Sequence, residues 1–85
     1  MTAAPLTLRI LTPLGTAFEG AVDAVYIPGS AGRFEVLPGH AAIITTLVAG
    51  ELRWRSPAGE ESVKVLTGAL RLKNDILTVC AELGE

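Results

Sequence analysis

Turn-forming residues recur along the whole chain, and they limit what the chain can fold into more than any other feature. The segments between the turns are too short for a long helix, and several contain β-branched residues, a pattern typical of sandwiches and barrels. Because 85 residues leave room for one hydrophobic core, we expect one domain over residues 1–85. The turn signals are Thr12–Gly15, Gly20, Pro28–Gly32, Pro38-Gly39, Ala49-Gly50, Ser56–Gly59, Gly68 and Asn74-Asp75.

Apolar and polar residues alternate inside most of these segments, as they do in a strand with one buried face. The turn at 56–59 joins two of the segments into a predicted hairpin. Asn74-Asp75 joins two others, because both residues tolerate the left-handed conformation of a tight turn. The sequence therefore predicts an all-β antiparallel sandwich with almost no helix. The alternating segments are Leu6–Ile10, Glu51–Arg55, Ser62–Val65, Ala69–Lys73 and Ile76–Val79.

Two further segments, Ala21–Ile27 and Ala42–Val48, are apolar on both faces of a predicted strand. One of these faces belongs to the core, and the other has to be covered as well. Either the chain's own loops cover it, or a permanent protein partner does. The sequence leaves both interpretations open.

Charge and cysteine content exclude several classes of protein. A net charge of −2 without a basic stripe argues against nucleic-acid binding. Cys80 has no second cysteine to pair with, and one cysteine with one histidine, His40, cannot form a structural zinc site. Met1–Pro5 lacks a signal-peptide pattern, and the uncharged stretch Val36–Gly50 is shorter than the ~20 apolar residues of a membrane span. We expect a soluble protein of a reducing compartment.

No residue pattern points to catalysis. His40 lies in a turn without a local Ser or Asp motif, so we interpret it as a turn or interface residue. Gly29–Gly32 superficially resembles a phosphate loop but lacks the lysine and the following helix. We therefore expect no catalytic residue, no cofactor and no metal.

Four other side chains have structural interpretations. Trp54 is predicted to fill the core, and Cys80 to be a small packed residue. Arg53 and Arg55 lie on the opposite face of the Trp54 strand, where they could pair weakly with acidic residues of the returning strand.

Residues Asp23–Thr45 strongly resemble the epsilon subunit of F-type rotary ATP synthases, which shows a run "-PGSEGEFGVLPGHAPLLT-" at this distance from the N-terminus. Leu8–Gly20 is similar to the opening strand, "-TP-" turn and "-FSG-" of that family. Leu47–Arg53 is similar to its "-L-PG-LR-", and Asn74–Ala81 to its "-NNVTVLAD-". The resemblance covers nearly the whole chain.

This resemblance implies a flattened antiparallel β-sandwich of about ten short strands without a catalytic residue. It also implies docking on the gamma subunit and on the polar loops of the c-ring, so that ion-driven rotation is coupled to ATP synthesis. The complex would hold the chain peripherally at the cytoplasmic face of the bacterial cell membrane. By resemblance, the gamma-facing residues are Thr12, His40 and Thr45, and the residues facing the c-ring are Ser30, Ala31, Gly32 and Arg33.

Two departures from the family pattern stand out. Arg33 replaces a common acidic residue, and Glu35 replaces a glycine, which would strain the backbone if that position needed glycine. The family usually continues into a helical hairpin that can bind ATP and inhibit hydrolysis. Because this sequence stops at Glu85, we expect that hairpin to be absent. The alternative to a central-stalk subunit is a free-standing β-sandwich adaptor or binding module.

Overall fold

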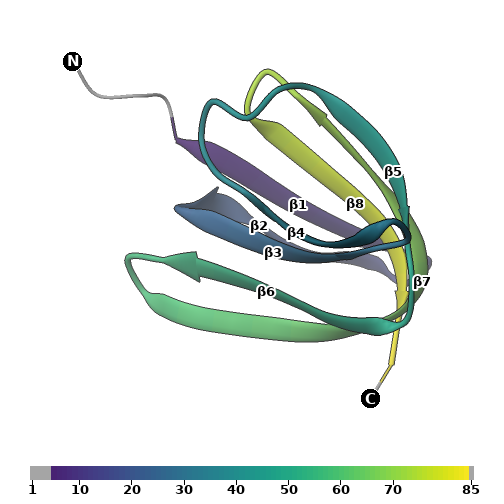
Figure 1. Ribbon diagram of the computed structural model, residues 1–85. Helices are drawn as coiled ribbons and strands as arrows, with labels where there is room; N and C mark the ends of the chain where they lie inside the picture. Colours follow the sequence, from purple (N-terminus) through teal and green to yellow (C-terminus); the bar gives the residue numbers. More distant parts are fainter. Residues whose placement is uncertain (1–4, 85) are drawn as a thin grey trace.

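The computed structural model describes residues 5–84, and within this range the chain forms eight strands and no helix (Figure 1). The absence of a signal peptide was inferred from residues 1–5, of which 1–4 lie outside the described part, as does residue 85. In this part of the chain there is thus no helix that could cross a membrane. The strands are β1 (Leu6–Thr12), β2 (Gly15–Val22), β3 (Ala24–Gly29), β4 (Gly32–Val36), β5 (Ile43–Leu47), β6 (Gly50–Ser56), β7 (Gly59–Lys73) and β8 (Ile76–Leu83).

The sheet folds over on itself into two layers because β7 pairs with strands of both. Residues Gly59–Val65 of β7 pair with β6, and residues Gly68–Lys73 pair with β5 and β8. In Figure 1, β7 runs along the bottom of the view and then turns upward. The first layer therefore has the order β2–β1–β8–β7–β5, and the second layer has the order β4–β3–β6–β7. The molecule is flattened, with extents of 39 × 26 × 19 Å.

The space between the two layers is filled by alternate side chains of nearly every strand. Each fully buried aliphatic side chain contributes about 1.5–3 kcal/mol relative to leaving it exposed. This core confirms the period-two pattern of the sequence. Its buried residues are Leu6, Leu8, Ile10, Val22, Val25, Ile27, Val36, Leu47, Leu52, Trp54, Val65, Leu70, Leu72, Leu77, Val79 and Ala81.

The all-β sandwich is confirmed, and two details differ from expectation. The described residues form eight strands rather than about ten, and one reason is that Gly68 does not break the chain. There, β7 continues through a bulge between Val65 and Thr67 and reaches 15 residues. In addition, the first and last strands, β1 and β8, lie side by side and pair in parallel, as strands joined by a long connection can.

The two segments that are apolar on both faces have different outcomes. Ala21–Ile27 is not one strand: the chain bends at Asp23, whose N–H donates to the Arg55 carbonyl over 2.7 Å. β3 is then covered on its outer face by the chain's own side chains, for example by Arg53, whose guanidinium lies 5.1 Å from the Tyr26 ring centroid. In β5, by contrast, Ile44 faces outward and is 80% exposed, so the chain's own loops within residues 5–84 do not cover this face.

Of the predictions for Trp54, Cys80 and Arg53, one is confirmed and two are wrong. Trp54 does fill the core, with its ring centroid 4.6 Å from that of Phe18. The prediction for Cys80 is wrong: it is exposed, because its neighbours Val79 and Ala81 take the inward positions of β8. The expected pairing with the returning strand is also wrong for Arg53, which contacts Glu51 of its own strand over 3.5 Å.

Arg55 lies directly opposite Glu60 of the returning strand. Among residues 5–84, however, the ion pairs are Arg9–Glu19 and Arg53–Glu51, so Arg55 does not form the predicted pair either.

Candidate interaction surfaces

The turn at Pro38-Gly39 is a type II β-turn that presents His40 to solvent. The His40 N–H donates to the Leu37 carbonyl over 3.1 Å, and Gly39 has φ +85°, the left-handed value that such a turn requires at its third position. The imidazole Nδ1 of His40 donates to the Ala41 carbonyl over 2.7 Å. The ring is therefore held against its own backbone, and its other nitrogen can reach a partner.

Thr12 is used inside the β1–β2 turn. Its hydroxyl donates to the Gly15 carbonyl over 2.9 Å and accepts the N–H of Leu14 over 3.1 Å. The two-residue loop Pro13-Leu14 is thereby fixed, with Leu14 fully exposed at its tip. The structure thus assigns Thr12 a turn-stabilising role, and the side chain that projects is Leu14.

Thr45 lies on the inner side of β5. It is half-buried and directly opposite the buried Leu70, on the same face as Leu47. The outward-facing residues of this strand are Ile44 and Thr46.

The β3–β4 hairpin presents Ser30-Ala31 as its two-residue loop, and Ser30 to Arg33 are all exposed. Ser30 ties the loop to β5: its N–H donates to the Thr46 carbonyl over 3.0 Å, and the two hydroxyls lie 2.8 Å apart. The loop is therefore attached to the first layer although it belongs to the second.

Arg33 reaches across its own sheet. It lies opposite Pro28 of β3, and its guanidinium Nη2 donates to the Glu51 carbonyl of β6 over 3.1 Å. Glu35 is unstrained, because the only non-glycine residues with positive φ between residues 5 and 84 are Asn74 and Asp75. The sequence-based concern about Glu35 is therefore wrong: the position does not require glycine.

The structure does not gather Thr12 and His40 into one place. Thr12 lies beside the C-terminal end of β8, since Leu11 is level with Cys80. His40 follows Gly39, which contacts Asp75 before the N-terminal end of β8. At a rise of about 3.3 Å per residue, some 20 Å of strand separates the two positions.

A row of uncharged side chains crosses the outer face of the first layer at the end where Thr12 lies. Leu11, Cys80, Ala69 and Thr46 lie opposite one another on β1, β8, β7 and β5, and we call them the uncharged row. With strands about 4.8 Å apart, the row is about 14 Å long. Sequence reasoning missed it because the alignment of β1, β7, β8 and β5 depends on strand pairings that the local pattern does not contain.

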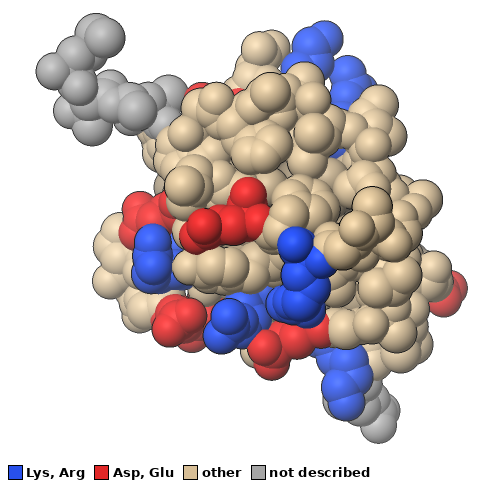
Figure 2. All heavy atoms as spheres, viewed as in Figure 1, with Lys and Arg blue, Asp and Glu red and all other residues tan. Residues whose placement is uncertain are grey.

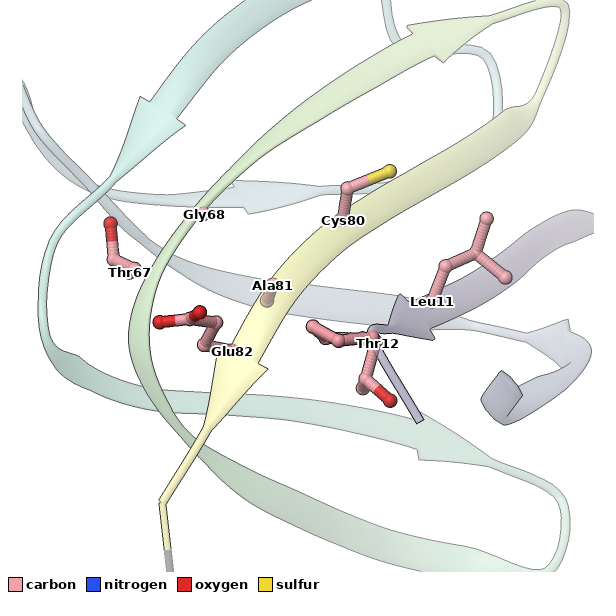
Figure 3. Close-up of a pocket in the computed structure, with 8 residues that line it drawn as sticks. Leu11, Thr12, Thr67, Gly68, Cys80, Ala81 and Glu82 are labelled. Atoms are coloured by element: carbon pink, nitrogen blue, oxygen red, sulfur yellow. The ribbon is translucent and has the colours of Figure 1, made fainter. Parts of the chain in front are cut away.

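The outer surface is hollowed at the β1 end of the uncharged row (Figure 3). The hollow measures about 440 Å³, and Glu82 supplies the one charged side chain in its lining. Gly68 lies where β7 and β8 approach so closely that a Cβ would stand 2.5 Å from the Cys80 carbonyl oxygen. The lining residues are Leu11, Thr12, Pro13, Thr67, Gly68, Cys80, Ala81 and Glu82.

The outer face of the second layer carries charges of both signs. Figure 2 shows acidic and basic side chains interspersed in the region of β3, β4 and β6, and a largely uncharged upper part. Facing positions of the strands bring these side chains together, so that they can neutralise one another at the surface. The charged residues of this face are Arg33, Glu35, Glu51, Arg53, Arg55, Glu60 and Lys64.

Comparisons with known proteins agree on one family. Residues 5–85 match the family described as "ATP synthase, Delta/Epsilon chain, beta-sandwich domain". The ATP synthase epsilon chain of Synechococcus sp. (strain WH7803) is 38% identical over 82 residues, which are 93% of this chain and 60% of that protein. The epsilon chain of Prochlorococcus marinus (strain MIT 9303) is 35% identical over 83 residues, which are 94% and 62% of the two chains. The chain thus spans about 60% of the length of these relatives.

Solved structures show the same fold. A chain in the Euglena gracilis mitochondrial ATP synthase structure (OSCP/F1/c-ring) superimposes with a TM-score of 0.88 at 18% identity, over 99% of this chain and 55% of that one. A chain in the Tetrahymena thermophila mitochondrial ATP synthase structure (central stalk/c-ring) gives 0.80 at 12% identity, over 100% and 69%. The family match over residues 5–85 and this agreement in fold show that the chain belongs to the ATP synthase delta/epsilon family and carries its β-sandwich domain.

Proposed function

We propose that this chain is a non-catalytic subunit of the central stalk of an F-type ATP synthase, where it docks on gamma and on the c-ring and couples ion-driven rotation to ATP synthesis. The observation that carries the proposal is the family match over residues 5–85. A coupling element has to transmit torque without deforming. A closely packed core between two layers that share β7 suits that task.

Gamma is proposed to contact Thr12, His40 and Thr45. Since Thr12 and His40 lie at opposite ends of β8, one partner can touch both only by covering the outer face of the first layer between them. The uncharged row crosses that face, and the centres of protein interfaces are poor in charged residues. Thr45 lies on the inner side of β5, so its contribution would be indirect, through the outward neighbours Ile44 and Thr46.

The c-ring is proposed to contact the exposed loop Ser30, Ala31, Gly32 and Arg33. Two attachments hold this loop, one from Ser30 to Thr46 and one from Arg33 to the Glu51 carbonyl. A loop fixed in this way loses little conformational entropy when it binds. The positive charge of Arg33 requires an acidic or carbonyl-rich surface on the ring loops.

In this role the chain needs no cofactor, metal or catalytic group of its own. It would lie at the cytoplasmic face of the bacterial cell membrane, held there by the complex. The ion that drives rotation is determined by the ring.

The test is co-purification of the 85-residue chain with the gamma subunit of the same organism, followed by amide exchange of the free and bound chain. We expect protection at the outward positions of β1, β8, β7 and β5. Failure to bind gamma, together with ATP synthesis that stays coupled after deletion of the gene, would favour the alternative of a free-standing adaptor.

A further inference from the structure

Asp75 joins three separate parts of the chain. Its carboxylate Oδ1 accepts the N–H of Gly39 over 2.7 Å, and its backbone carbonyl accepts the N–H of Thr7 over 2.8 Å. The β7–β8 turn is thereby attached both to the loop between β4 and β5 and to the first strand. In Figure 1 that loop passes beside the β7–β8 turn at the top of the view.

The carboxylate supports a loop with few other attachments. Residues 37 to 42 are all exposed, and the turn bond between His40 and Leu37 joins residues within the loop itself. The bond from Gly39 to Asp75 spans 36 residues of sequence and connects the loop to the sheet. A backbone N–H that donates to a carboxylate makes a bond roughly twice as strong as one between neutral groups.

The turn that carries Asp75 has the geometry of a tight hairpin turn. Asn74 and Asp75 have φ values of 51° and 60°, the paired left-handed conformation of a two-residue hairpin turn, and Lys73 and Ile76 pair on either side. The backbone that carries the Asp75 carboxylate is therefore held in place by the hairpin, as a positioning group requires.

We propose that Asp75 is the positioning residue for the Pro38-Gly39-His40 turn, and that it presents His40 to the partner in a fixed orientation. Its importance for gamma rests on the proposed function, whereas its effect on the loop does not. Holding the turn in place before binding lowers the entropy that is lost when the complex forms.

Asp75→Gly tests this role, because glycine accepts the same positive φ but removes the acceptor. The matched control is Asn74→Gly, which changes the neighbouring position of the same turn. The conservative variant Asp75→Asn keeps an oxygen at Oδ1. We expect the Gly39 amide to exchange about tenfold faster in Asp75→Gly, and within about threefold of the parent in the other two variants.

The Thr7 amide is an internal reference, because it bonds to the backbone carbonyl of Asp75, which every variant retains. Unchanged protection of Gly39 in Asp75→Gly would overturn the proposal. So would equal loss of protection at Gly39 and Thr7, since Asp75 would then serve the hairpin as a whole and not the loop.

Binding to immobilised gamma supplies the functional readout. Asp75→Gly should bind about three- to tenfold more weakly than the parent, and Asp75→Asn should restore the affinity. Release of the Gly39 amide with full affinity would overturn the role in presenting His40. If the parent itself fails to bind gamma, the proposed function fails, while the exchange data still decide the structural role of Asp75.

Discussion

The outer face of the second layer carries charged side chains in every row of paired residues, whereas the first layer has one row without a charge. On the second layer three of the charged residues have partners within the chain. Arg53 contacts Glu51 and covers Tyr26, and Arg33 donates to the Glu51 carbonyl. On the first layer, the uncharged row of Leu11, Cys80, Ala69 and Thr46 offers small or apolar groups to solvent.

This difference shows how one pattern of alternation can build two unlike surfaces. Both layers place apolar residues inward, so the core depends on the inward positions alone. The outward positions are then free to vary with what covers them. Charges suit water, and uncharged groups suit a protein partner, because burying unpaired charges destabilises a complex.

A charge placed in the uncharged row should have the largest effect on gamma binding. We expect Ala69→Glu to weaken binding about 100-fold, because a carboxylate buried there without a partner costs about 3 kcal/mol. The matched control is Ser62→Glu, which adds the same side chain to an exposed outward position of the same strand, beside Arg53. Equilibrium binding of the two variants to gamma measures the difference.

Both substitutions lie at the surface, so each should change the free energy of unfolding by no more than about 0.5 kcal/mol. Similar losses of affinity from Ala69→Glu and Ser62→Glu would show that the two outer faces do not differ in their contribution to gamma binding. Loss confined to Ser62→Glu would place gamma on the second layer.

Gly68 lies where β7, the strand shared by both layers, passes from the second layer into the first. A Cβ there would lie 2.5 Å from the Cys80 carbonyl oxygen and 2.9 Å from the Ala81 Cα, so β7 and β8 would have to separate. We expect Gly68→Ala to lower the free energy of unfolding by about 1–3 kcal/mol, as overpacking does. Urea denaturation measures it, with Thr67→Ala, an exposed neighbour, as the control. Equal stability of the two variants would mean that the strands separate without penalty.

Gly68 also shows where sequence reasoning fails. A glycine between apolar segments is a turn signal in sequence, and here it permits close contact between strands, a property of the partner strand that local pattern does not contain. Asn74-Asp75 was correctly predicted as a turn because the reason is local: both residues tolerate positive φ. The inward positions were predictable for the same reason, since alternation is a property of each strand alone.

The candidate sites were less predictable than the fold. Thr12 and His40 lie in turns, as their neighbours in sequence indicate, yet the distance between them depends on the parallel pairing of β1 with β8. Cys80 was misjudged because cysteine is commonly buried, whereas the phase of the β8 alternation places it outward. The uncharged row could not be predicted, because its four residues come together only through the pairing of four strands.

Reversing the charge of Arg33 should have a moderate effect on binding to the c-ring. We expect Arg33→Glu to weaken association with the isolated ring about tenfold, because like charges then face each other across the contact. Arg53→Glu is the comparison, since Arg53 lies on the same outer face but on β6, outside the Ser30–Arg33 loop. Titration of labelled chain against the ring measures both, and comparable losses would mean that the loop has been assigned to the wrong partner.

The smallest expected effect concerns the ion pair Arg9–Glu19, next to the uncharged row on β1 and β2. Its atoms are 3.4 Å apart, and both side chains are exposed, by 41% and 56%. A double-mutant cycle with alanine should give a coupling below about 1 kcal/mol that declines as salt screens it. A larger coupling that persists in salt would mean that the first layer, like the second, uses its charges within the chain. A small coupling would leave Arg9 and Glu19 available to gamma, the partner proposed for this face.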